Sequence, residues 1–287
     1  MSQRSYGFQN LRIEIFEVMK SIKLIICVLG LVSLFGCEKS VKDYGNLEFM
    51  TNDDAIVKIN MASVYPDDRY MYVKFNDQRV TPLIRAREPY PGGGWNTRGD
   101  SRADFLRIKS GNVNVKLGLP KKKDDGTDSL ILYETNIMLT AGKRYTLHLA
   151  DTAANTKSLL TEEDFSVPDS LYARYRFVNL MPNVPAVDLY YGFFSTTAAG
   201  QVATQDSLVA SNIKFMEMSE YFVLNRSVSR TWKVRPAGAA VTNATVIAFY
   251  GNAGTIVNQR TYTAFALGYN GQTSTAMKPY LSFFNIR

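Results

Sequence analysis

Apolar and polar residues alternate along several short stretches of the chain. The cleanest example is 112–119, in which Val113, Val115 and Leu117 alternate with polar or small residues. Similar alternation recurs in four further stretches, 70–75, 144–149, 187–191 and 231–235. A period of two places one face of a strand on a core and the other face in water, as in antiparallel sheets. We therefore predict β-strands in these five stretches, with their polar faces in solvent.

Turn-forming residues punctuate these stretches. They occur at Asn76-Asp77, Pro91–Gly94, Asp124–Gly126, Pro236–Gly238 and Asn270-Gly271. Short strands at this spacing are typical of β-sandwiches. Helix is expected only as single turns, near Leu159–Asp164 and Asn212–Met218. The predicted fold class is all-β.

The two halves of this body share landmarks in the same order. The first landmark aligns Ile59–Pro66 with Val178–Pro185 and places Asn60 on Asn179. The second aligns Val115–Leu117 with Trp232–Val234, and the third aligns Tyr145-Thr146 with Tyr262-Thr263. The offsets stay near 117 to 119 positions. Such a repeat indicates a tandem duplication with a joint near Leu159–Leu171. We expect two tandem immunoglobulin-like β-sandwich domains, over residues 53–160 and 170–287.

The N-terminal region has the three-part plan of a secretory signal. Lys20 and Lys23 precede an apolar run from Leu24 to Phe35, and charge returns at Glu38. The run has 12 residues, whereas a membrane span takes about 20. Residues 1–36 are therefore interpreted as a signal peptide. The basic residues occupy their usual place if translation starts at Met19.

Cys37 closes this signal. Leu34-Phe35-Gly36-Cys37 resembles the lipobox of bacterial lipoproteins, which implies that Cys37 is lipidated and becomes the new N-terminus. Residues 37–52 would form a flexible tether to the membrane, and the expected location is the outer membrane of the cell envelope. Glu38–Asp43 loosely resembles a surface-export tether, so surface exposure and a plain linker are both open.

Charge and residue counts exclude several classes of site. The formal net charge is +7, with basic residues dispersed rather than clustered on one stretch, which argues against nucleic-acid binding. Of the two cysteines, Cys27 lies inside the leader and Cys37 at its end, so the mature body has no thiol pair and a disulfide scaffold is excluded. A single histidine, His148, excludes ordinary Cys/His zinc sites. We expect no cofactor, no metal, and a solvent-exposed His148.

Catalytic patterns are not found in the sequence. A catalytic histidine works with a nucleophile and an orienting acid. The sequence has no Gly-x-Ser-x-Gly elbow, and the mature chain has no cysteine nucleophile, so neither partner is available to His148. The Asp124–Asp128 segment has alternating oxygen ligands but lacks the terminal glutamate of a calcium loop. A charged hairpin tip is favoured there, with a weak cation site as the alternative.

One loop is a candidate binding site. Tyr90-Pro91-Gly92-Gly93-Gly94-Trp95 is flanked by Arg87 and Arg98 within the insertion 81–109. Exposed aromatic rings can stack on sugars or on a partner protein, and arginines supply charged hydrogen bonds. Tyr90, Trp95, Arg87 and Arg98 are therefore the predicted ligand-binding residues. The alternative is that Trp95 folds back over the sandwich edge.

The second half also resembles a family. Arg176–Asn179 with Val184–Tyr190, then Val234–Gly238 and Arg260–Gly268, are similar to the bacterial domain of unknown function 4397. The resemblance covers about 173–270 and, more weakly, 55–151. The first half departs from it at Asp67-Asp68-Arg69 and at the insertion. The resemblance implies exported, envelope-associated β domains and no established catalytic residues.

Together these patterns predict a non-enzymatic lipoprotein of the cell envelope. It would be a binding or assembly module for protein or polysaccharide at the outer membrane. The alternative is a carbohydrate-active or other hydrolase with an unrecognised site. A purely structural spacer would not need the aromatic loop.

Overall fold

The structure is a computed structural model that describes residues 51–287, apart from 101, 126, 194–205, 226–229 and 252–256. Residues 50–287 form one compact unit. The predicted signal peptide, Cys37 and the predicted tether up to residue 50 lie outside the described residues. Within the described ranges, no helix has the length and apolarity needed to cross a membrane.

The first half contributes two four-stranded sheets, in the orders β5-β1-β8-β9 and β3-β2-β6-β7. Alternating apolar residues of both sheets, among them Val57, Val115 and Leu147, point into one buried core. The strands run β1 Asp54–Ala62, β2 Tyr72–Phe75, β3 Gln78–Arg79, β4 Gly94–Trp95, β5 Leu106–Lys109, β6 Gly111–Pro120, β7 Asp128–Leu139, β8 Arg144–Ala150 and β9 Lys157–Glu162.

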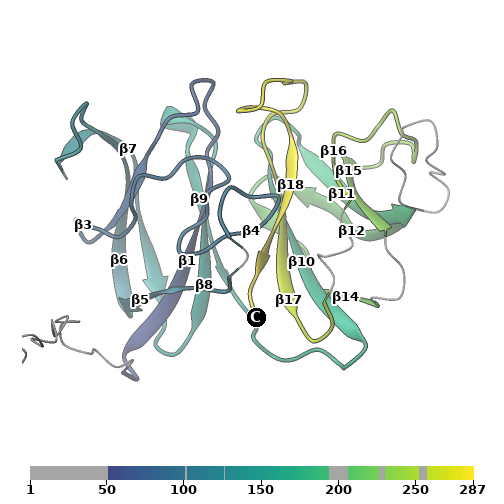
Figure 1. The fold of residues 1–287 in the computed structure, drawn as a ribbon, viewed down its shortest axis with the longest axis horizontal. Coiled ribbons are helices and arrows are strands. Elements are labelled where there is room, and N and C mark those ends of the chain that lie inside the picture. Colours follow the sequence, from purple (N-terminus) through teal and green to yellow (C-terminus); the bar gives the residue numbers. More distant parts are fainter. Residues whose placement is uncertain (1–50, 101, 126, 194–205, 226–229, 252–256) are drawn as a thin grey trace, which may run out of the picture. The chain divides into compact units, whose positions relative to one another are not determined.

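The second half repeats this plan (Figure 1). One sheet has the order β13-β10-β17-β18, with β14 also paired to β10, and the other has the order β12-β11-β15-β16. Trp232 is fully buried in the core between them. The strands run β10 Tyr172–Leu180, β11 Ala186–Phe193, β12 Ser207–Lys214, β13 Glu217–Met218, β14 Phe222–Asn225, β15 Arg230–Pro236, β16 Ala248–Tyr250, β17 Thr261–Leu267 and β18 Tyr280–Asn285.

The predicted all-β architecture is confirmed, with two details that differ. One pair in each half is parallel, β1 with β8 and β10 with β17, so one sheet of each half is mixed and the other is purely antiparallel. The helical turns expected at Leu159–Asp164 and Asn212–Met218 are wrong. These segments belong to β9 and to β12 and β13, because pairing with β8, β11 and β10 overrides weak local helix preference.

The repeat is visible in the register of the parallel pairs. Val57 pairs with Tyr145, and Tyr175 pairs with Tyr262, and all four side chains point into their own cores. Val57 and Tyr175 are 118 positions apart. Asn60 and Asn179, at an offset of 119, lie on opposite faces of equivalent strands, because a shift of one residue reverses the face.

The polar faces predicted to lie in water are partly buried. Thr146 and His148 of β8 are fully buried beside a third apolar cluster, which joins Ala62 and Ala150 of the first half to Phe265 and Phe284 of the second. These residues come from β1, β8, β17 and β18, so the two sandwiches share this cluster.

The polar face of β15 is buried as well, within the second half. The side chains of Lys233 and Arg235 are 0% exposed, and both cations pair with the Asp206 carboxylate, at 2.6 and 2.7 Å. Arg235 also lies directly across from Asp188 on β11. Neutralisation by nearby carboxylates is what lets these cations leave water.

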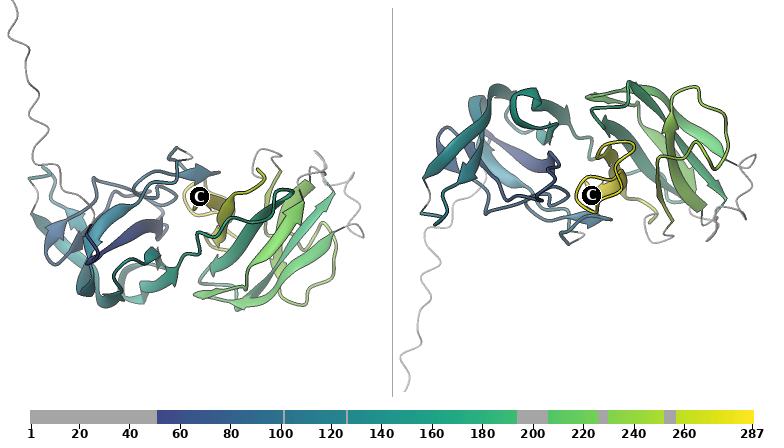
Figure 2. Two further views of the ribbon diagram at one scale, coloured as in Figure 1. Left: turned by 90° about the horizontal axis from the view of Figure 1, so that it is seen from below. Right: turned by 90° about the horizontal axis from the view of Figure 1, so that it is seen from above.

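A short strand from the first half joins the sheet of the second. In β4, Gly94 and Trp95 pair antiparallel with Phe284 and Phe283 of β18. Figures 1 and 2 show this blue segment beside the yellow C-terminal strand. A side chain at Gly94 would collide with the Phe283 carbonyl oxygen, so the close approach requires glycine.

Candidate functional site

The predicted binding loop lies against the second sandwich. The Trp95 ring is half-buried and meets the Tyr262 ring edge-on, with centroids 5.2 Å apart. Tyr90 is also half-buried, and its backbone pairs with that of Ile59 on β1. Trp95 therefore covers the edge of a sandwich, as in the alternative interpretation, and that sandwich is the second one.

The two arginines of the loop have partners within the chain. The Arg87 guanidinium stacks on the Tyr280 ring at 3.4 Å and donates to the Asn96 carbonyl oxygen at 2.8 Å. Arg98 donates to both carboxylate oxygens of Asp68 at 2.8 Å. These contacts hold the loop in place. Ligand binding by Tyr90, Trp95, Arg87 and Arg98 stays a prediction.

His148 is buried, and the expectation of an exposed histidine is wrong. Its Nδ1 accepts a hydrogen bond from the Asn60 amide at 2.9 Å, and Nε2 lies 3.3 Å from the Thr161 hydroxyl. Burial, with a smaller effect of Arg176, lowers the pKa of His148 to about 3. A neutral imidazole held in this way is a structural group between the sandwiches.

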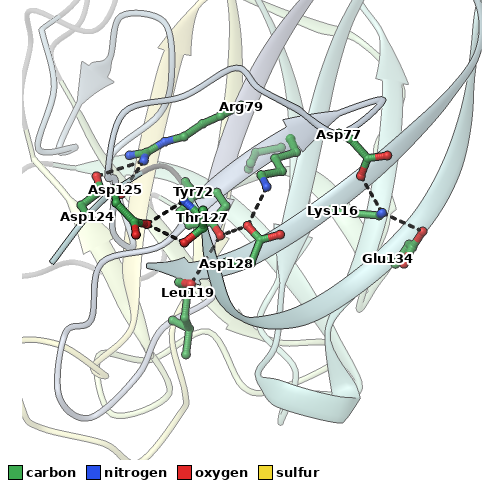
Figure 3. Close-up of polar contacts among 12 residues, drawn as sticks. Tyr72, Asp77, Arg79, Lys116, Leu119, Asp124, Asp125, Thr127, Asp128 and Glu134 are labelled. Atoms are coloured by element: carbon green, nitrogen blue, oxygen red, sulfur yellow. Dashed lines mark hydrogen bonds and ion pairs between the residues drawn. The ribbon is translucent and has the colours of Figure 1, made fainter. Parts of the chain in front are cut away.

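The acidic hairpin is neutralised by its own neighbours (Figure 3). Asp124 accepts from Arg79 at 2.8 and 2.9 Å, and Asp125 accepts from the Thr127 hydroxyl at 2.5 Å. Asp128 pairs with Lys74 at 2.7 Å and also accepts from the Tyr72 hydroxyl. In the described part of the chain, no cluster of three or more His, Cys, Asp or Glu could hold a metal ion.

An open groove of about 550 Å³ lies beside the Tyr90–Trp95 segment, lined by residues of the first half and by Phe165 of the joint that follows it. We call it the Arg144 groove, and its lining includes Ile56, Pro91, Asp104, Phe105, Arg107, Arg144 and Phe165. A hollow of about 390 Å³ adjoins it and shares Arg144 and Phe165. Strands β1, β5 and β8 form the floor, because their residues 56, 107 and 144 are in register.

Aromatic rings and cations dominate this groove. The Phe105 and Phe165 rings are half-buried, with centroids 5.5 Å apart and planes tilted by 59°. The Arg144 guanidinium lies 3.5 Å from the centre of the Phe165 ring. Burial, followed by the positive charge of Arg287, lowers the pKa of Arg144. Apolar surface with a few placed polar groups is typical of small-ligand sites.

Behind the groove lies a buried lysine. The Lys58 ammonium donates to the Pro91 carbonyl oxygen at 2.6 Å and lies 5.1 Å from the Phe105 ring centre. Burial lowers the pKa of Lys58 to about 8, against the raising effects of Asp104, Asp100 and Glu163. Lys58 thus orders Pro91 and Phe105 and adds positive charge beneath the groove.

The groove was missed at the sequence level for a simple reason. Phe105 and Phe165 lie outside alternating stretches, and about 60 residues separate them in the chain. Arg144 occupies a polar position of an alternating stretch, and the alternation predicts only that its side chain faces water. The one available signal was the cluster of arginines in the insertion, and that signal selected Arg87 and Arg98 instead.

Comparison with protein families finds one match. The model of the family described as Domain of unknown function (DUF4397) matches residues 98–190. This is the family that the sequence analysis named. The match runs from the insertion through β10 into β11, so it includes parts of both ranges in which the resemblance was expected, 55–151 and 173–270. No curated protein matches the chain.

Three solved structures have distant similarity to the chain. A streptococcal virulence factor that binds α-glucan is 10% identical, with 79% of this chain and 96% of that chain covered and a TM-score of 0.22. A proposed cell adhesion protein from Bacteroides eggerthii is 10% identical, with 84% and 98% covered and a TM-score of 0.23. A family 26 carbohydrate-binding module from Eubacterium rectale Amy13K, in complex with maltoheptaose, is 12% identical, with 77% and 95% covered and a TM-score of 0.18. At these TM-scores the similarities carry no argument about ligand or function.

Proposed function

We propose that this chain is a non-enzymatic binding module of the bacterial cell envelope. Lipid on Cys37 would anchor it to the outer membrane, and residues 37–52 would tether the two sandwiches, which we propose to be of the immunoglobulin-like type. The Arg144 groove would bind a polysaccharide or an envelope protein. Surface exposure is part of this proposal.

The observation that carries the binding role is the composition of the Arg144 groove. Phe105 and Phe165 leave apolar ring surface in an open groove, and the stacked Arg144 adds a charged donor beside it. Exposed aromatic rings beside an arginine are a combination that binding surfaces favour. The surrounding strands hold these groups on a rigid floor.

The anchor is supported by the sequence alone. The apolar run Leu24–Phe35 ends at Gly36-Cys37, and charge follows at Glu38. Replacing Cys37 with Ser should move the protein from the membrane fraction to the soluble fraction and remove the lipid mass from its N-terminal peptide. Retention of the Cys37→Ser protein in the membrane fraction would contradict lipid anchoring at this residue.

The binding role can be tested with immobilised full-length protein. Polysaccharide and protein fractions from bacterial outer membranes would be passed over the wild type, Phe165→Ala and Phe249→Ala. Phe249 is 65% exposed on β16 of the second sandwich, so its loss is a matched control. We expect at least one component of these fractions to bind to the wild type and to Phe249→Ala but not to Phe165→Ala. Equal retention by all three, or turnover of a substrate by rigorously purified protein, would overturn the proposal.

A further inference from the structure

We infer that the Arg144 groove binds an acidic polysaccharide, through the carboxylate of a uronic acid residue. This inference rests on the proposed binding role and specifies the ligand of the same groove. It follows from the charge that the groove leaves unbalanced and from the position of that charge on the Phe165 ring, which is itself in contact with Phe105.

Of the two arginines that line the groove, Arg107 pairs with the Asp54 carboxylate at 3.8 Å, whereas Arg144 has no carboxylate partner among the described residues. Its guanidinium stacks on Phe165, and among the residues that the structure describes it forms no ion pair. A stacked guanidinium keeps the N–H donors on its rim available, and this planar fork matches a carboxylate. Arg287 lies close enough for its charge to act on Arg144, and its Nη1 donates to the Phe165 carbonyl oxygen at 2.8 Å.

The acids around the same hollow are already neutralised. Glu162 pairs with Lys143 at 2.6 Å, Glu163 pairs with Arg176 at 2.7 Å, and Asp164 pairs with Arg174 at 2.8 Å. None of these carboxylates is left to balance Arg144. Asp104, the carboxylate that lines the groove itself, lies 3.7 Å from the Arg102 guanidinium. The charge that remains beside Phe165 is positive, and it is further supported by the buried Lys58 ammonium behind Phe105. An anionic ligand is therefore favoured.

The aromatic rings favour a sugar over an acidic peptide. A uronic acid carries its carboxylate directly on a rigid ring, whose C–H face is apolar. In the groove the Arg144 guanidinium lies 3.5 Å from the centre of the Phe165 ring, and the Phe105 ring centre lies 5.5 Å from that of Phe165. One uronic acid unit could therefore pair its carboxylate with Arg144 and pack its C–H face on a phenylalanine ring. An Asp or Glu side chain offers the carboxylate on a flexible stem without such a face.

The test measures binding of full-length lipidated protein in detergent to three uronic acid polysaccharides: polygalacturonate, alginate and hyaluronate. Fully methyl-esterified polygalacturonate and dextran are the neutral counterparts, and poly-glutamate is the acidic peptide. The variants are Arg144→Gln and Arg144→Lys. Arg69→Gln is the control, because Arg69 pairs with Asp67 on the surface and does not line the groove. Thermal midpoints confirm that each variant is folded.

We expect at least one acidic polysaccharide to bind the wild type and Arg69→Gln, and its neutral counterpart not to bind. Loss of a charge-assisted pair should weaken binding about tenfold or more in Arg144→Gln, with part of it kept in Arg144→Lys. Equal binding of the methyl ester, equal binding by Arg144→Gln, or preference for poly-glutamate would overturn the inference. Absence of binding to all three acidic polysaccharides would overturn it as well. A groove-dependent component in the fractionation experiment would then still support the broader binding role.

Discussion

The carboxylate of Glu163 lies 2.7 Å from a guanidinium nitrogen of Arg176, with the two side chains 0% and 6% exposed. Glu163 follows the last strand of the first sandwich, and Arg176 lies on β10 of the second. The same carboxylate accepts from the Thr161 hydroxyl at 3.1 Å and from the Thr263 hydroxyl at 3.3 Å. This buried pair therefore ties the two sandwiches together through side chains from both.

Removing one partner of this pair should be costly. Glu163→Gln leaves the Arg176 charge buried without its counter-ion, so we expect the free energy of unfolding to fall by about 3–5 kcal/mol. Urea denaturation of the purified protein measures the change. Glu162→Gln is the matched control, because Glu162 and its partner Lys143 are about half exposed and such pairs contribute about 0–1 kcal/mol. Similar losses for both variants would contradict a special role for Glu163.

The contact of β4 with β18 should depend on Gly94. In Gly94→Ala the new methyl group meets the Phe283 carbonyl oxygen, so the strand must move away. Overpacking of this kind costs about 1–3 kcal/mol, and Trp95 should leave the Tyr262 ring and fluoresce at longer wavelength. Arg102→Ala, at a side chain that is 73% exposed in the same insertion, should change neither property. An unchanged emission maximum in Gly94→Ala would contradict this arrangement.

Acid should weaken the fold through His148. Its pKa is about 3 in the folded protein against 6.5 in the unfolded chain, so between these values the unfolded chain binds the extra proton. The free energy of unfolding is unaffected by this group above about pH 6.5 and falls as the pH drops below it. From pH 7 to pH 5 we expect a loss of about 2 kcal/mol from this group.

The pH dependence of His148 can be isolated by substitution. His148→Gln keeps an amide that can bond to Asn60 or Thr161 but does not titrate, and the chain has no other histidine. Urea denaturation at several pH values should therefore give a shallower decline between pH 6.5 and 5 for the variant than for the wild type. Parallel curves would show that another group is responsible.

The alternating pattern predicted the strands well where one face meets a local core. Val113, Val115 and Leu117 lie in β6 and are buried, as the period of two requires. The same pattern failed for the opposite faces of β8 and β15. Alternation identifies which residues share a face, but it does not say whether a second layer covers the polar one.

The candidate site also has features that the sequence reveals and features that only the fold creates. The Tyr90–Trp95 segment stands out in the sequence because aromatic and glycine residues are concentrated in it. Its contacts with Tyr262 and β18 depend on residues more than 160 positions away, which no local pattern encodes. Phe105 and Phe165 carry no motif, and they form a groove with Arg144 only after the chain between them has folded.

By itself the sequence determined the strand-rich body and the repeat of its landmarks, because periodicity and turn chemistry are local properties. It also predicts a signal that ends at Cys37, from a short apolar run. Tertiary structure alone decided that His148 and Lys58 are buried, that β4 extends the second sandwich, and that Arg144 stacks on Phe165 with no carboxylate partner in the described part of the chain. Burial and charge balance depend on which layers meet in space. The packing of these layers depends on many weak contacts between residues far apart in the sequence, so no single segment encodes it.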